Sequence, residues 1–261
     1  MPDADIYPYF LTPHDTNPEK SLFVFLPGMD ESEKLALYQV ASVKAAFNVR
    51  CLVIQPNVME SWDMLCDQVI ALTQAELKTV PHQSSIYLCG ESFGGCLALK
   101  VMVKAPHLFQ QVILVNPASS FNRRPWIHWG SLLTRWLPEW LYQMFAAFTL
   151  PFLASKGRMT PEAHRALLES VRSVPIKTSV QRLSLMRDFD LDEGQLQRFT
   201  QPVLLIASQS DTLLPSVAEA KRLSRIFPNA TVVTLPHSGH ACLLEADVNL
   251  YEIMQSVNCI E

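Results

Sequence analysis

The stretch 85-SIYLCGESFGGC-96 begins as a run of β-branched and aromatic residues and breaks at glycine, after which LALKVMVKA is typical of a helix. A strand that ends on glycine, followed by a turn too tight for side chains on its flanks, exposes one serine hydroxyl at the N-terminus of the next helix. The pattern therefore predicts that Ser92 is a nucleophile. The alternative is that Gly90 and Gly94 are ordinary turn residues and that Ser92 only caps the helix.

A serine presented in this way requires an acid, and then a histidine, near the ends of later strands. Asp211 follows the strand-like PVLLIAS of residues 202–208 and is the predicted acid. Asn116 ends an earlier strand, but an amide cannot stabilise an imidazolium by charge. The competing interpretation of Asp211 is an N-cap for the helix that begins near Pro215.

Two histidines follow the next strand, ATVVTLP of residues 230–236, and either could be the base. Gly239 favours His240, because a glycine just before it lets the loop fold back over Ser92. His237 lies beside Pro236 at the strand exit. We therefore predict His240 as the base and His237 as a loop residue.

A site of this kind also needs two backbone N–H groups that stabilise a developing oxyanion. The buried strand SLFVFL ends in Pro27-Gly28-Met29 and supplies one loop. The N–H groups of Met29 and Phe93 are the predicted donors, and each such donor is worth about 3 kcal/mol. The alternative is that Pro27-Gly28 is only a turn.

With these motifs the chain resembles the α/β-hydrolases, and more narrowly the esterase, lipase and thioesterase group related to the hydrolase segment of plant phytyl ester synthases. The residues that carry the resemblance are FLPGMD (25–30), RCLVIQPN (50–57), LCGESFGGCLALKV (88–101), LVNPASSF (114–121), SDTLLPS (210–216) and SGHACLLE (238–245). Many hydrolases carry histidine where this chain has Pro27. The resemblance does not extend to the second, acyltransferase-type domain of the plant proteins, so we expect one domain over residues 1–261.

Composition agrees with one globular domain, since 261 residues that are 49% hydrophobic can bury a substantial core. A net charge of −4 provides no basic surplus for nucleic acid. No metal or phosphate motif stands out, so we expect neither a metal nor a cofactor. The acidic, proline-containing N-terminus resembles neither a signal nor a transit peptide. We expect a cytoplasmic protein whose six cysteines are reduced and mostly buried.

Apolar strand-like runs alternate with helical stretches, which predicts an α/β fold with a mainly parallel sheet and helices on both faces. The predicted strands are 21–26, 49–55, 85–90, 111–116, 202–208 and 230–235. The predicted helices are 33–46, 62–79, 93–104, 215–227 and 243–257. Within the α/β-hydrolase fold, residues of about 118–200 are predicted to form a helical lid insertion.

This insertion holds four of the five tryptophans, followed by the apolar LYQMFAAFTLPFLAS. Three interpretations stay open: an ordinary buried core, a wall of a long apolar substrate pocket, or a surface that also docks on an internal membrane. Prolines and Glu139 interrupt the stretch and argue against a spanning helix. The candidate substrate-binding residues are Trp126, Trp129, Trp136, Trp140 and Phe145.

An apolar lid suits a lipophilic substrate, because each methylene removed from water is worth about 0.8 kcal/mol. We expect a long-chain acyl ester or thioester as donor and a covalent acyl-enzyme on Ser92. If water attacks that intermediate, the protein is an esterase, lipase or thioesterase. If a lipophilic alcohol such as phytol or a glyceride attacks it, the protein is an acyltransferase, which the resemblance favours. A non-catalytic fold that binds a lipid or a protein is the remaining alternative.

Overall fold

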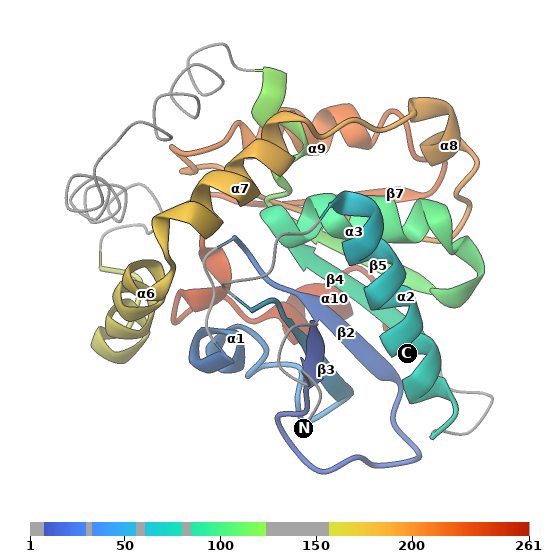
Figure 1. Cartoon of the computed structure of the whole chain (residues 1–261), viewed down its shortest axis with the longest axis horizontal. Helices are drawn as coiled ribbons and strands as arrows, with labels where there is room; N and C mark the ends of the chain where they lie inside the picture. Colours follow the sequence, from blue (N-terminus) through green and yellow to red (C-terminus); the bar gives the residue numbers. More distant parts are fainter. Residues whose placement is uncertain (1–7, 30–32, 56–60, 80–84, 124–156, 261) are drawn as a thin grey trace.

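The computed structural model describes residues 8–29, 33–55, 61–79, 85–123 and 157–260. Seven strands in this part of the chain form one sheet in the order β1-β3-β2-β4-β5-β6-β7 (Figure 1). Only β1 runs antiparallel to its neighbour, and every other pairing is parallel. The strands are β1 (Tyr9–Leu11), β2 (Leu22–Leu26), β3 (Asn48–Val53), β4 (Ile86–Glu91), β5 (Gln111–Val115), β6 (Val203–Ser208) and β7 (Ala230–Leu235).

The central strands are buried on both faces. In β2, alternate side chains pack into hydrophobic clusters on opposite sides of the sheet. Leu22, Val24 and Leu26 join one hydrophobic cluster, whereas Phe23 and Phe25 join the cluster on the other side. Successive side chains of a strand point to opposite faces, so an unbroken apolar run requires a cover on each side. The parallel sheet predicted from these runs is confirmed.

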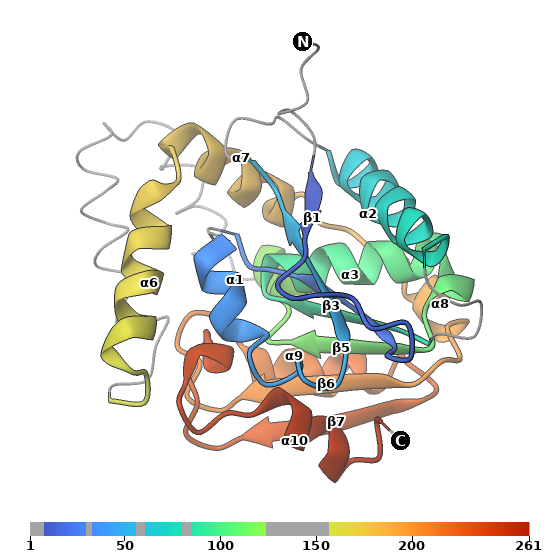
Figure 2. The same ribbon diagram turned by 90° about the horizontal axis from the view of Figure 1, so that it is seen from below.

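Helices provide this cover in two layers (Figures 1 and 2). Residues of α2, α3 and α9 belong to the first cluster, and residues of α1 and α10 pack in the second. The helices are α1 (Glu33–Gln39), α2 (Trp62–Leu77), α3 (Phe93–Lys104), α6 (Pro161–Ser173), α7 (Ile176–Arg187), α8 (Glu193–Gln197), α9 (Ser216–Leu223) and α10 (Leu250–Ser256). Short 3-10 helices are η1 (Pro106–Leu108), η2 (Ala118–Arg123) and η4 (Cys242–Leu244).

Helix α9 ends at Leu223, four residues before the predicted end, and three further elements differ more clearly from the prediction. The pattern missed β1, a three-residue strand at the sheet edge whose side chains are at most half-buried. The helix predicted over 33–46 ends at Gln39, and the chain continues in short-range turns such as that from the Val43 N–H to the Val40 carbonyl. The helix predicted over 243–257 is split into η4 and α10, because the Asn249 side chain caps a new start by accepting from the Glu252 N–H.

The insertion between β5 and β6 is helical where it is described. It contributes η2, α6, α7 and α8. Figure 1 shows α6 and α7 beyond the end of the sheet toward which the β4 arrow points. The candidate lid residues Trp126, Trp129, Trp136, Trp140 and Phe145 lie outside the described residues, so their predicted contact with a substrate stays a prediction.

All six cysteines are free thiols, and five of them are buried, as predicted. Burial raises the pKa of the Cys66 thiol to about 12 and that of the Cys89 thiol well above its ordinary value. These groups are therefore protonated at neutral pH and poor nucleophiles.

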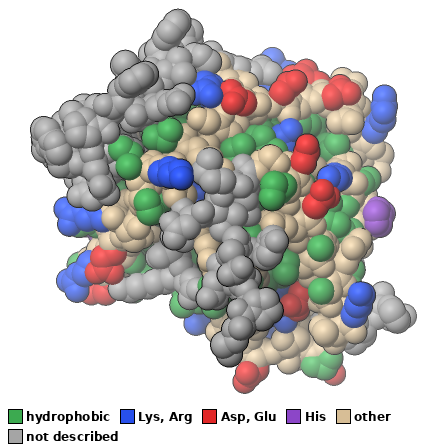
Figure 3. All heavy atoms as spheres, viewed as in Figure 1, with side chains coloured by type: hydrophobic (Ala, Val, Ile, Leu, Met, Phe, Trp, Pro, Cys, Tyr) green, Lys and Arg blue, Asp and Glu red, His purple; other side chains and the backbone are tan. Residues whose placement is uncertain are grey.

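Two further observations concern the charged surface and the length of the helices. Acidic and basic side chains are interspersed on the face shown in Figure 3. None of the helices described has the length and apolar character needed to cross a membrane.

Candidate functional site

Ser92 occupies a strained turn between β4 and α3. Its backbone dihedrals are φ 53° and ψ −112°, a conformation that costs a non-glycine residue about 1–3 kcal/mol. The Ser92 N–H donates to the Val115 carbonyl, and the Ser92 carbonyl accepts from the Ala118 N–H, both at 3.0 Å. Hydrogen bonds to β5 and η2 therefore hold the strained residue in place.

The glycines of this turn are needed for close approach. A Cβ atom at Gly94 would lie 1.9 Å from the Leu26 carbonyl oxygen, and one at Gly90 would lie 2.3 Å from the Gly94 oxygen. Glycine at position 94 therefore lets α3 begin directly against the end of β2, and glycine at position 90 lets α3 pack against β4. The pattern that predicted a tight turn is explained by this packing.

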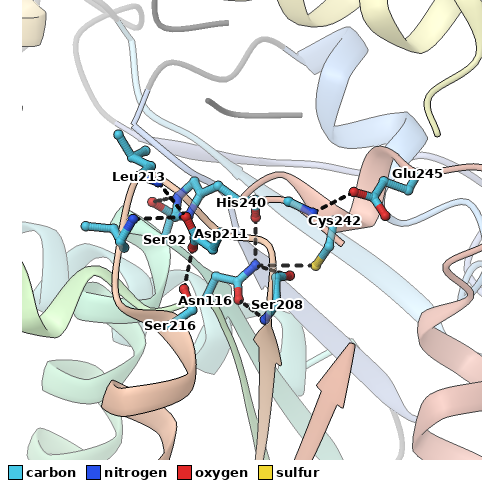
Figure 4. A network of polar contacts seen from close by, with 11 residues as sticks. Ser92, Asn116, Ser208, Asp211, Leu213, Ser216, His240, Cys242 and Glu245 are labelled. Carbon is cyan, nitrogen blue, oxygen red and sulfur yellow. Dashed lines mark hydrogen bonds and ion pairs between the residues drawn. The ribbon is translucent and has the colours of Figure 1, made fainter. Parts of the chain in front are cut away.

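The three distant polar residues come together at the ends of their strands (Figure 4). The His240 Nε2 atom lies 2.8 Å from the Ser92 Oγ atom, and the His240 Nδ1 atom lies 2.8 Å from an Asp211 carboxylate oxygen. The Ser92 side chain makes no helix-capping bond, so the interpretation of Ser92 as a simple N-cap is not supported. In this arrangement the imidazole can accept the serine proton while the carboxylate holds the Nδ1–H.

Asp211 both braces a turn and faces the histidine. One oxygen accepts from the N–H groups of Leu213 and Leu214 at 2.9 Å, and the other accepts from the Ser216 hydroxyl and contacts His240. Burial by itself raises the pKa of the Asp211 carboxyl, but the His240 charge and these hydrogen bonds outweigh burial and lower the pKa below its ordinary value. Asp211 is therefore ionised, and its side chain is fully buried beside His240.

Asn116, rejected as an acid, has a supporting position below the histidine (Figure 4). Its side-chain nitrogen donates to the His240 carbonyl at 2.7 Å and to the Ser208 hydroxyl at 2.9 Å, and its oxygen accepts from the Ser208 N–H at 2.8 Å. Its backbone has φ 43°, a left-handed conformation that asparagine tolerates better than most residues. The amide thus ties the ends of β5 and β6 to the histidine loop.

A buried carboxylate holds the other side of that loop. Glu245 accepts from the Gly239 N–H at 2.8 Å and from the Arg158 side chain at 2.7 Å, and its own side chain is fully buried. Arg158 also contacts the exposed Asp247 at 2.7 Å. His237 is exposed, in line with its assignment as a loop residue. Residues 158 and 245 are 87 positions apart and share no motif, so the sequence did not predict this contact.

Replacing Glu245 by glutamine is expected to lower the free energy of unfolding by about 2 kcal/mol, because glutamine keeps one acceptor oxygen but removes the buried negative charge that pairs with Arg158. We also expect about tenfold slower ester turnover, since Gly239 precedes His240. Urea unfolding and kcat measure the two effects. Asp247→Asn is the matched control, because it removes the exposed partner of the same arginine and should cost less than about 1 kcal/mol. Equal losses in the two variants would contradict a special role for Glu245.

The two predicted oxyanion donors lie on adjacent loops. Met29 follows β2, and Phe93 is the first residue of α3, which follows β4. Since β2 and β4 are parallel neighbours, both loops leave the same edge of the sheet. The packing of Gly94 against the Leu26 carbonyl brings these loops into contact. The assignment of the two N–H groups as donors stays a prediction.

The described residues contain no group of three or more histidine, cysteine, aspartate or glutamate side chains that could hold a metal ion. The polar groups at this edge of the sheet are instead engaged with one another, as the serine–histidine–aspartate chain and the Asn116 contacts show.

Comparison with known proteins agrees with this geometry. Residues 55–247 match the family described as serine aminopeptidase, S33. The chloroplastic phytyl ester synthase 1 of Arabidopsis thaliana is 30% identical over 260 residues, covering 89% of this chain but only 36% of the plant protein. A pimeloyl-acyl carrier protein methyl ester esterase of Nitrosomonas europaea is 30% identical over 198 residues, covering 72% of this chain and 77% of the esterase.

A solved structure shows the same fold. A lipase-esterase related protein from Clostridium acetobutylicum has a TM-score of 0.75 at 16% identity, with 99% of this chain and 100% of that chain covered. The family match spans most of the chain, and the mainly parallel sheet agrees with it. The chain therefore belongs to the serine aminopeptidase S33 family of α/β-hydrolases and is a hydrolase-type enzyme.

Proposed function

We propose that this protein transfers acyl groups from lipophilic esters or thioesters by way of an acyl-enzyme on Ser92. The observation that carries the proposal is the chain of two 2.8 Å contacts from the Ser92 hydroxyl through His240 to Asp211. A nucleophile, a base within hydrogen-bond reach and a carboxylate that orients the base are the parts that acyl transfer requires.

The steps follow from the geometry. His240 Nε2 takes the Ser92 proton as Oγ attacks the acyl carbonyl carbon, and the N–H groups of Met29 and Phe93 stabilise the resulting oxyanion. His240 then gives the proton to the leaving oxygen or sulfur, which departs and leaves the acyl group on Ser92. In the second half, His240 takes a proton from the acceptor hydroxyl as its oxygen attacks the acyl carbon. His240 then returns that proton to Ser92 Oγ as the bond between the acyl carbon and Oγ breaks, which releases the product and restores the serine hydroxyl.

The acceptor decides between two activities, and we favour a long-chain alcohol over water. The support is the 30% identity to a phytyl ester synthase over 89% of the chain. An oriented neighbour can reach an effective molarity of about 10⁵ M, so a bound alcohol can outcompete 55 M water in a dry site. We propose phytol or a partial glyceride as the acceptor class, and phytyl esters or acylglycerols as products.

A long-chain acyl donor distinguishes transfer to an alcohol from hydrolysis. The enzyme would be incubated with p-nitrophenyl palmitate in detergent micelles, with and without phytol or diacylglycerol, and the products identified by mass spectrometry. We expect phytyl palmitate or triacylglycerol when the alcohol is present. Free palmitate alone in every tube would exclude the transferase and leave the esterase, lipase or thioesterase alternative.

A fluorophosphonate probe tests the proposal against a non-catalytic binding protein. Covalent labelling of the folded wild type, and none of Ser92→Ala, supports an enzyme that uses this serine. Absence of labelling in both folded proteins would favour a fold that only binds a lipid or a protein partner.

A further inference from the structure

Helix α7 (Ile176–Arg187) makes a direct contact with the loop that carries Met29. The Arg182 side chain is 7% exposed, and its guanidinium donates to the Met29 carbonyl and, at 2.9 Å, to the Ile54 carbonyl. Ile54 directly follows β3, and Met29 follows β2. One planar group thus bridges the ends of two neighbouring strands, and its rigid fork fixes both carbonyls relative to each other.

The same helix also reaches the second proposed oxyanion donor, through Trp62. The Trp62 indole N–H donates to the Leu185 carbonyl of α7 at 2.8 Å. The indole ring stacks on the Phe93 ring, with centroids 4.9 Å apart and planes at 24°. The ring of Phe189, just beyond α7, meets Trp62 edge-on at 5.6 Å. Phe93 is therefore held between the sheet and side chains anchored on α7.

We propose that α7 clamps the oxyanion hole and that Arg182 is its positioning residue. The inference rests on the proposed function, in which the N–H groups of Met29 and Phe93 receive the oxyanion. In this proposal Arg182 acts on the oxyanion through Met29 and not by binding the substrate. It acts by holding the Met29 carbonyl, one residue along the backbone from the Gly28–Met29 peptide that carries the donor. On this account α7, which belongs to the insertion between β5 and β6, aligns the groups that stabilise the oxyanion.

Alignment matters because an oxyanion donor is effective only at about 2.7–3.1 Å from the charge that develops. Loss of a complete donor costs about 10²- to 10³-fold in kcat. A donor that is present but loosely held should cost less. The guanidinium also places a positive charge beside the loop, which favours the negative transition state over the neutral substrate.

The test compares Arg182→Met, Arg182→Lys and Arg187→Met in the full chain with p-nitrophenyl palmitate. For Arg182→Met we expect kcat to fall about 30- to 100-fold with KM changed less than about threefold, because the lost interaction acts mainly in the transition state. Arg182→Lys keeps the charge and one donor and should recover part of the loss. Arg187 lies on the same helix and pairs with the adjacent Asp188, so Arg187→Met should stay within about twofold of wild type.

A transition-state analogue distinguishes positioning from simple destabilisation. A long-chain trifluoromethyl ketone forms a tetrahedral adduct with an active serine and puts an oxyanion in the hole. In the Arg182 variants the inhibition constant of this ketone should rise by the same factor by which kcat/KM falls. Binding of a non-hydrolysable ether analogue should stay constant. A structural defect alone would weaken both ligands or lower the active fraction.

The outcomes separate the clamp from the proposed function. A folded, active Arg182→Met with kcat within threefold of wild type would overturn the clamp and leave the acyl-transfer proposal intact. A wild type that neither labels with fluorophosphonate nor turns over esters would overturn the proposed function itself. If Arg182→Met does not fold, Trp62→Phe takes its place, since it removes the bond to Leu185 and keeps an aromatic ring beside Phe93. Its kcat should fall about five- to tenfold, and an unchanged kcat would count against the clamp.

Discussion

Replacing Ser92 by alanine is expected to reduce kcat for ester turnover by about 10⁶-fold, to the level left by binding and the oxyanion donors. The reason is that the substitution removes the hydroxyl that lies 2.8 Å from the His240 Nε2 atom. The protein should remain folded, because Ser92 is held by backbone hydrogen bonds that alanine also makes. Alanine at φ 53° keeps the strain of the turn.

Fluorophosphonate labelling and circular dichroism check this result together. Ser224→Ala is the matched control, since the Ser224 hydroxyl donates to the Lys221 carbonyl in an exposed hydrogen bond at the end of α9. It should label like the wild type. Labelling of a folded Ser92→Ala would mean that another nucleophile reacts. The buried thiols are unsuited to that role, because burial raises the pKa of Cys66 and Cys89.

Asp211→Asn is expected to lower kcat by about 10⁴-fold, equivalent to about 5.5 kcal/mol. Asparagine keeps an oxygen for the N–H groups of Leu213 and Leu214, so the turn should survive. It lacks the charge that stabilises the imidazolium and can present an N–H to His240, which favours the wrong tautomer. Asp188→Asn is the control, because that carboxylate is exposed and pairs with Arg187. A kcat of Asp211→Asn within tenfold of wild type would remove Asp211 from the mechanism.

The same variant has a signature in the pH dependence of stability. The pKa of the Asp211 carboxyl is lowered in the folded protein, so its ionisation favours folding above the unfolded pKa of about 3.9. That contribution is lost as the pH falls through the lower, folded pKa. The free energies of unfolding of wild type and Asp211→Asn, measured with denaturant, should therefore differ by a constant amount near neutral pH. Below about pH 4 the wild type should lose the stabilisation that ionised Asp211 provides. A constant difference down to acid pH would contradict the lowered pKa.

The residues between β5 and β6 contribute to both sides of the site. Arg158 reaches the histidine loop through Glu245, and Arg182 reaches the loop of Met29. The Ala246 N–H also donates to the Arg158 carbonyl at 2.8 Å. The described part of the insertion is thus joined to the hydrolase sheet at two of its catalytic loops.

Local patterns in the sequence determined the fold class and the order of the six parallel strands along the chain, and they predicted the serine, acid and histidine that the structure brings together. Short unbroken apolar runs bounded by turn residues are typical of strands covered on both faces, and Gly90 and Gly94 allow an approach that no side chain permits. The sequence also favoured Asp211 over Asn116 as the acid, because only the aspartate side chain carries a charge. The edge strand β1 was missed because three residues are too few to show a period.

Only the tertiary structure decided which side chains support that site. Asn116 meets the His240 carbonyl 124 residues away, and Arg182 meets the Met29 carbonyl 153 residues away. Glu245 and Arg158 are 87 residues apart and belong to different elements. These side chains bind backbone groups or single charges, which occur throughout the chain. No local sequence pattern therefore predicts the pairs. Their pairing depends on how the insertion packs across the ends of the strands, and that is a property of the folded chain.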